Sequence, residues 1–254
     1  MFNISKQSYD FIALPNGYII LLTVHFTLII LDQNYHFVRE ITNVNGDYLY
    51  VKGLCYNEDE NVFYISDKHH RKILMVDWHF NLMRSVCSKG TDEHQFDNIE
   101  GLCFKNENLY VCDTSNNRIQ IFDSILNLVN SLKLDFSPLN IKVSESLICI
   151  ESSWISPGTY FYHVNNLSFH SKFEFDETGR ISEINSHFYE FHASSKTMTC
   201  YNKNGNLEEK FVLSGFSSNS LSDRYDGAFS HYRGKLIMLS YSQTKLITFS
   251  HNLV

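Results

Sequence analysis

The chain has 254 residues, a formal net charge of −7, and 43% hydrophobic residues. This length is enough to bury a large core. The acidic balance argues against a partner held by bulk attraction to phosphates, and we expect no DNA partner; an RNA site would have to be a local basic patch. Fifteen Tyr and twenty Phe stand against only three Pro. Because aromatic side chains suit a pleated, half-buried surface, this composition predicts an all-β protein.

The first residues, MFNISKQSYD, lack the apolar core of a secretory signal. The most apolar run, residues 18–31, is too short for a membrane-spanning helix and is interrupted by His25. We therefore expect two strands joined by a turn at residues 23–26, and no membrane association.

One pattern of four short strands is repeated along the chain, which indicates a repeat architecture. The first strands are predicted at residues 11–14, 53–56, 101–104, 140–143, 181–184 and 227–230. The second strands are predicted at residues 18–23, 62–67, 109–114, 147–152, 188–193 and 235–240. The third strands are predicted at residues 27–32, 72–77, 118–123, 159–164, 198–203 and 245–250. The fourth strands are predicted at residues 36–41, 82–87, 128–133, 167–172 and 207–212.

The sixth copy has no fourth strand of its own, because only the residues HNLV follow its third strand. Residues 2–7, FNISKQ, have the right length to take that place. We expect them to pair beside the last copy and to close a ring of six four-stranded antiparallel sheets, which protects two sheet edges. The whole chain, residues 1–254, is then a single domain, and we expect a monomer.

Residues 101–123, GLCFKNENLYVCDTSNNRIQIFD, and residues 53–77 carry a more specific pattern. They resemble the NHL-repeat family of β-propellers, in which a Gly and an apolar strand precede a strand ending in Asp and then an N-x-R-I segment. The resemblance implies a six-bladed propeller similar to the C-terminal propeller of TRIM-NHL proteins. We expect no RING, B-box or coiled-coil segment with it.

The densest positive run, KHHRK at residues 68–72, lies in the loop between the second and third strands of the second copy. Lys68, His69, His70 and Arg71 are therefore candidate ligand-binding residues. Arg118, which opens a third strand, is another, because the resemblance places the matching Arg on or near the rim. The alternative for Arg118 is a salt bridge with a loop carboxylate.

The predicted topology places two kinds of side chain around the KHHRK loop. The basic Lys52 and Lys89 come within reach of it, and so do four acidic side chains, Asp92, Glu93, Asp97 and Glu100, which reduce its attraction for phosphates.

Asp67 and Asp113 end second strands, where a carboxylate accepts hydrogen bonds from the backbone of the following turn. We expect a structural role for both. Long loops at residues 88–100, 151–159 and 214–226 should project from the same face as the KHHRK loop. Large side chains on them, Trp154, Tyr225 and Phe216, are candidates for a binding hot spot.

No catalytic or metal-binding motif is found in the sequence. His69 and His70 are adjacent and would point to opposite sides of an extended strand, and none of the twelve histidines falls within a predicted first strand. A histidine-liganded lyase is therefore not expected. A calcium-dependent lactonase is an alternative, with Glu100, Asn140, Glu183 and Asp226 at or beside first strands.

The sequence thus favours a non-enzymatic binding module without cofactors, which recognises a protein or peptide on its loop-rich face. RNA is the alternative, since the resemblance includes RNA-binding propellers, and a lactonase-like hydrolase is a third hypothesis. Six scattered cysteines without a C-x-x-C pair predict free thiols in a cytoplasmic protein.

Overall fold

The computed structural model describes residues 2–3, 8–152, 157–174, 180–185, 187–192, 195, 197–212, 229–232, 235–240 and 245–249. These residues fall into two compact units: residues 41–178, and residues 1–40 together with 179–254. Apart from one short 3-10 turn, Thr114–Asn116, every described element is a β-strand. The predicted all-β class is confirmed.

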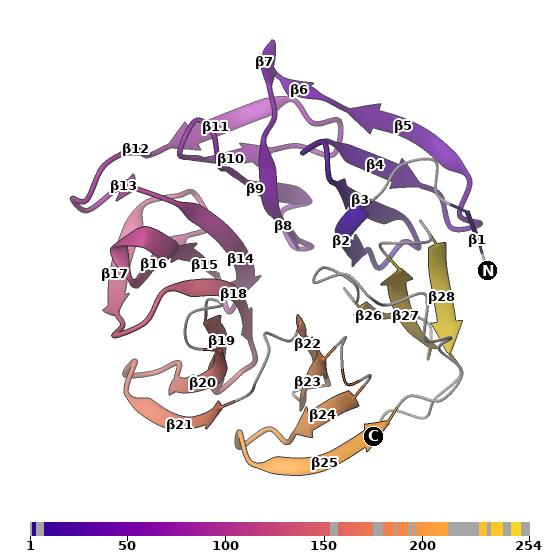
Figure 1. Cartoon of the computed structure of the whole chain (residues 1–254). Helices are drawn as coiled ribbons and strands as arrows, with labels where there is room; N and C mark the ends of the chain where they lie inside the picture. The colour runs from indigo at the N-terminus through magenta and orange to yellow at the C-terminus, as the bar shows by residue number, and fades with distance from the viewer. Residues whose placement is uncertain are drawn as a thin grey trace. The chain divides into compact units, whose positions relative to one another are not determined.

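Residues 41–178 contain three four-stranded antiparallel sheets, each made of consecutive strands (Figure 1). The first comprises β8 (Val51–Asn57), β9 (Val62–Asp67), β10 (Lys72–Val76) and β11 (Leu82–Val86). The second comprises β14 (Ile99–Lys105), β15 (Asn108–Asp113), β16 (Arg118–Asp123) and β17 (Leu128–Lys133). The third comprises β18 (Pro138–Val143), β19 (Leu147–Ser152), β20 (Gly158–His163) and β21 (Phe169–Glu174).

The described residues of the other unit also form three four-stranded sheets. One comprises β2 (Ser8–Ala13), β3 (Ile19–Thr23), β4 (Leu28–Leu31) and β5 (Phe37–Ile41). The next comprises β22 (Arg180–Ile184), β23 (His187–His192), β24 (Thr197–Tyr201) and β25 (Leu207–Val212). The last comprises β26 (Phe229–Tyr232), β27 (Lys235–Ser240), β28 (Lys245–Phe249) and the N-terminal β1 (Phe2–Asn3).

The last sheet is completed from the N-terminus, as the sequence predicts. Phe2 pairs with Leu246 and Asn3 with Lys245 in an antiparallel ladder between β1 and β28. The rest of the predicted segment, residues 4–7, lies outside the described residues. In the part of the chain that the structure describes, the number of four-stranded sheets therefore equals the number of copies of the pattern in the sequence.

Most predicted strands agree with the observed ones within two residues, and two differences are informative. β21 begins at Phe169 rather than at residue 167, because Leu167 adopts a left-handed conformation with φ 56° and belongs to the turn. β26 spans Phe229–Tyr232 rather than 227–230, so it includes His231. The expectation that no histidine lies in a first strand is therefore wrong.

The second and third strands form the interior of the sheets. β9 and β19 are buried at every position, and β16 at every position but the last. Both faces of these strands are therefore covered, which explains their continuous apolar sequences. The fourth strands are more exposed, and β11 and β17 present Met83 and Val129 to solvent.

The first strands of adjacent sheets approach each other closely within residues 41–178. A Cβ atom on Gly101 would lie 2.8 Å from the Leu139 carbonyl oxygen and 2.9 Å from Asn140 Cα. A Cβ atom on Gly53 would lie 3.1 Å from the Glu100 carbonyl oxygen. Glycine at these two positions lets β8, β14 and β18 pack with their backbones nearly in contact.

The turns between β10 and β11 and between β16 and β17 share one hydrogen-bonding pattern. Asp123 Oδ1 accepts the backbone N–H groups of Ile125 and Asn127 at 3.1 and 2.7 Å, and Asp77 Oδ1 accepts those of His79 and Asn81, both at 2.8 Å. Because the carboxylate binds two N–H groups of the turn, it fixes the reversal between the strands.

A bulky apolar residue adopts the left-handed conformation at the fourth position of these turns. Phe80 has φ 65° and Leu126 has φ 66°, which is unusual for residues with large side chains. Both are buried, and Phe80 stacks on Phe63 with ring centroids 5.1 Å apart. Packing therefore offsets the backbone strain.

Two short pairings were not predicted from the sequence. β6 (Asn43–Val44) and β7 (Asp47–Tyr48) form a hairpin around Asn45 and Gly46, which both have positive φ. β12 (Ser88–Lys89) and β13 (Gln95–Phe96) pair in parallel within the connection between β11 and β14.

Candidate functional site

Arg118 is buried and anchors the connection before β14. Its Nε donates to Asp113 Oδ2 at 2.7 Å, and its Nη2 donates to the carbonyl oxygens of Asp92 and Gln95 at 2.7 and 2.9 Å. The residue is 9% exposed. The hydrogen-bonding capacity of Arg118 is thus directed into the protein, in agreement with the salt-bridge alternative rather than with direct contact to a ligand.

Asp113 is the centre of the same network and is fully buried. Besides Arg118 it accepts the side-chain amides of Asn116 and Gln120 and the backbone N–H of Asp97 at 3.2 Å. The expected structural role of Asp113 is supported, but its backbone donor comes from the preceding connection instead of the following turn. Asp67 does accept its turn, from the N–H of His70 at 3.2 Å.

The basic side chains of the 68–71 turn are paired with the acidic side chains of the connection before β14. Lys68 Nζ lies 2.6 Å from Glu100 Oε1, and Lys52 Nζ lies 3.5 Å from the other oxygen of the same carboxylate. Arg71 Nη2 lies 3.9 Å from Asp97 Oδ1. The expected proximity of this turn to residues 88–100 is confirmed, and the ion pairs reduce its positive potential.

His69 and His70 lie in a turn and not in an extended strand, so the expectation that they point to opposite sides is wrong. Their ring centroids are 5.0 Å apart. The Tyr50 ring lies 4.6 Å from His69 and 6.2 Å from His70, between centroids. His70 Nδ1 is also 2.8 Å from Asp67 Oδ2. We call Tyr48, Tyr50, His69 and His70 the aromatic patch; Tyr48 and Tyr50 are 72% and 38% exposed.

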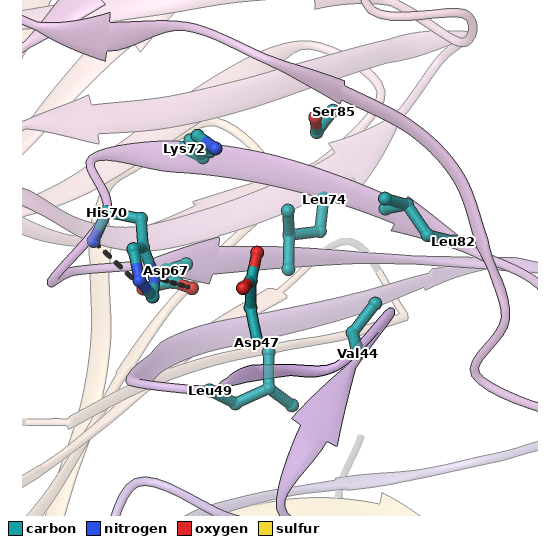
Figure 2. Close-up of a pocket in the computed structure, with 9 residues that line it drawn as sticks. All are labelled: Val44, Asp47, Leu49, Asp67, His70, Lys72, Leu74, Leu82 and Ser85. Atoms are coloured by element: carbon teal, nitrogen blue, oxygen red, sulfur yellow. Dashed lines mark hydrogen bonds and ion pairs between the residues drawn. The ribbon is translucent and has the colours of Figure 1, made fainter.

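A small pocket adjoins this patch (Figure 2). It has a volume of about 30 Å³ and lies between the β6–β7 hairpin and strands β9 to β11. Its apolar lining residues are Val44, Leu49, Leu74 and Leu82, and its polar ones are Asp47, Asp67, His70, Lys72 and Ser85. Figure 2 shows Asp47 extending from the hairpin into the middle of the pocket.

Sequence reasoning named His70 in this region but missed the residues of the hairpin. Tyr48, Tyr50 and Asp47 come from a segment that the four-strand pattern leaves between two copies. The Asn45–Gly46 dipeptide is the signal that could have identified it, because Asn-Gly favours a two-residue hairpin turn.

Trp154, Tyr225 and Phe216 lie outside the described residues. Of the lactonase-like set, Glu100 is engaged by Lys52 and Lys68, Asn140 Oδ1 accepts the N–H of Ile141 at 2.9 Å, and Asp226 lies outside the described residues. Among the described residues, no three His, Cys, Asp or Glu side chains are arranged to hold a metal ion.

All six cysteines are free thiols, as the sequence predicts. Burial raises the pKa of Cys112 well above its usual range and that of Cys87 to about 12. None of the helices in the described part of the chain has the length and apolarity needed to cross a membrane.

A comparison with family models finds the NHL repeat at residues 96–122, which overlap the segment that carries the resemblance. The chain contains an NHL repeat. A comparison with curated proteins finds no match.

Solved structures show that this chain has a β-propeller fold. Streptogramin B lyase is similar with a TM-score of 0.70 and 10% identity, covering 100% of this chain and 87% of that one. The Neurospora crassa Pan2 WD40 domain is similar with a TM-score of 0.67 and 8% identity, covering 93% of this chain and 73% of that one. The Cps50 (Swd1) propeller of Myceliophteria thermophila is similar with a TM-score of 0.62 and 10% identity, covering 99% of this chain and 98% of that one. At these identities the likeness concerns the fold alone.

Proposed function

We propose that this NHL-repeat propeller is a non-enzymatic binding module for a protein or peptide, and that the partner contacts the aromatic patch. The observation that carries the proposal is the exposure of two tyrosines, 72% for Tyr48 and 38% for Tyr50, beside a pocket. Tyrosine is enriched at binding hot spots, because its ring provides a large contact area at little cost in conformational entropy.

The charges around the patch favour a protein over RNA. The basic residues Lys52, Lys68 and Arg71 face Glu100 and Asp97, and the whole chain has a net charge of −7. An RNA backbone would have to displace these carboxylates or bind beside them. RNA therefore remains an alternative that the experiment must test.

A catalytic role has less support in the geometry. The name of one structural neighbour, streptogramin B lyase, is that of an enzyme, so the fold alone does not decide between catalysis and binding. The distinguishing feature is the site: Glu100, the carboxylate that a lactonase-like site would use, is held by two lysines. We infer that this carboxylate orders the loops and does not bind a metal ion.

The test selects peptides from a random library on the wild-type protein and measures their affinity for variants. We expect Tyr48→Ala combined with Tyr50→Ala to weaken the selected peptides at least about ten-fold, as loss of a hot spot does. Val129→Ala, an exposed apolar residue on β17, is the matched control and should change affinity less than about two-fold. Peptides that bind the tyrosine variant as well as the wild type would refute the proposed surface.

The RNA alternative has its own outcome. Single-stranded RNA should then bind with a log–log salt slope of about −0.7 for each phosphate neutralised. Lys68→Glu combined with Arg71→Glu would abolish that binding, whereas the tyrosine variant would keep most of it. This result would show that the ligand of the surface is RNA and not a protein.

A further inference from the structure

The pocket beside the aromatic patch combines an apolar wall with a carboxylate at its centre. Val44, Leu49, Leu74 and Leu82 supply the wall. Asp47 reaches into the space between them (Figure 2). Such a lining suits a side chain with a hydrocarbon stem and a charged end, because the stem contacts the apolar wall while the charge meets a polar group.

The size of the pocket restricts what enters it. A cavity needs about 10–15 Å³ to hold one water molecule, and this pocket measures about 30 Å³. It therefore has room for the end of one side chain and not for a whole small molecule. A primary ammonium group with its last methylene is small enough for such a space.

The charged side chains in the pocket differ in whether they already form hydrogen bonds or ion pairs within the protein. Asp67 is held by His70, through both the backbone N–H and Nδ1. Within the part of the chain that the structure describes, the side chains of Asp47 and Lys72 make no hydrogen bond and no ion pair. Two carboxylates against one lysine leave the lining with an excess of negative charge. Asp47 is the carboxylate available to a cation from outside.

We propose that this pocket receives the ε-ammonium group of a lysine side chain from the partner. The inference rests on the proposed protein-binding function and specifies the partner as a lysine-containing segment. The lysine stem packs against Leu74 and Leu82, and its ammonium donates to Asp47. The residues flanking the lysine contact Tyr50 and His69, whose rings lie 4.6 Å apart beside the pocket.

Lys72 gives the proposal a second consequence of opposite sign. Lys72 lines the same pocket, so its positive charge repels an incoming cation. Removing the charge of Asp47 should therefore weaken binding, and removing the charge of Lys72 should strengthen it. A carboxylate ligand would show the reverse pattern, because it would be held by Lys72 and repelled by Asp47.

The experiment titrates the pentapeptide acetyl-Gly-Ser-Lys-Ser-Gly-amide into the protein at low salt and follows the leucine methyl groups by NMR. The same peptide with Nε-acetyllysine is the ligand control, because it keeps the stem and loses the charge. Asp47→Asn should weaken binding about two- to five-fold and Lys72→Gln should tighten it by a similar factor, the range of an exposed ion pair. Asp59→Asn, an exposed carboxylate in the 57–61 turn, is the protein control and should have no effect.

The results separate this inference from the proposed function. The inference is wrong if the acetyllysine peptide binds equally well, if Leu74 and Leu82 do not respond, or if Lys72→Gln weakens binding while Asp47→Asn strengthens it. If the affinity of the library peptides still depends on Tyr48 and Tyr50 in those cases, the proposed protein-binding surface is retained and only the lysine specificity is refuted. When they do not depend on the tyrosines, the proposed function fails as well.

Discussion

Replacing Asp113 with alanine should destabilise the protein by about 3 kcal/mol, because it leaves a buried guanidinium without its carboxylate. Asp113 is fully buried and Arg118 is 9% exposed, so water replaces the lost partner poorly. Arg118 keeps two backbone carbonyls, those of Asp92 and Gln95. We therefore expect a value at the lower end of the range for broken buried pairs, about 3–5 kcal/mol.

A double-mutant cycle measures whether the pair is the cause. Arg118→Met alone removes the cation but leaves Asp113 with Asn116, Gln120 and the Asp97 backbone. The double variant lacks both charges, so its loss of stability should be smaller than the sum of the single losses by at least about 1 kcal/mol.

Urea unfolding, with midpoint and slope fitted separately, provides the free energies. Additive losses, or a loss below about 1 kcal/mol for Asp113→Ala, would refute the reasoning. So would a stable Arg118→Met variant that no longer binds the library peptides, because Arg118 would then act at the binding surface.

Three further predictions concern other parts of the molecule. Gly101→Ala should lower the free energy of unfolding in urea by about 1–3 kcal/mol, because its Cβ would meet backbone atoms of Leu139 and Asn140 at 2.8 and 2.9 Å. Gly53→Ala should lower it less, and equal losses of stability in the two variants would contradict the packing argument. Asp123→Ala removes the acceptor of two turn N–H groups and should lower stability by about 1–2 kcal/mol, whereas an unchanged midpoint would assign the turn to packing alone. Burial raises the pKa of Cys87 to about 12, so at pH 8 its thiolate fraction is about 10⁻⁴ and alkylation of Cys87 in the native protein should be slow. After denaturation without reductant all six thiols should react, and a disulfide found by mass spectrometry would disprove that they are free.

The sheet architecture could be read from the sequence because many second and third strands are apolar along most of their length and polar residues mark the turns between strands. β9, β16, β17, β19, β25 and β27 have the predicted bounds. Among these strands, β9, β16 and β19 are recognisable as short apolar runs, since both of their faces are buried. β21 was placed two residues early because Leu167, an apolar residue in a left-handed turn, looks like a strand residue in the sequence.

The binding surface could be predicted only in part. The ion pairs of Lys68 and Arg71 follow from topology, which brings the 68–71 turn beside residues 88–100. The burial of the Arg118 side chain could not be predicted from the topology, because the sequence does not show that the connection before β14 offers two carbonyl groups to its guanidinium. The hairpin that carries Tyr48 falls outside the four-strand pattern, and a search for that pattern passes over it.

The ladder between Phe2 and Leu246 determines when the last sheet can be completed during folding. The five other four-stranded sheets among the described residues are built from strands that follow one another along the chain, so they need only short loops to close. The last sheet must join two segments separated by nearly the whole chain, and closing so long a loop has a high entropic cost and slows folding. On a ribosome this pairing waits until residue 246 has emerged, so until then β1 has no strand to pair with and remains open to wrong partners.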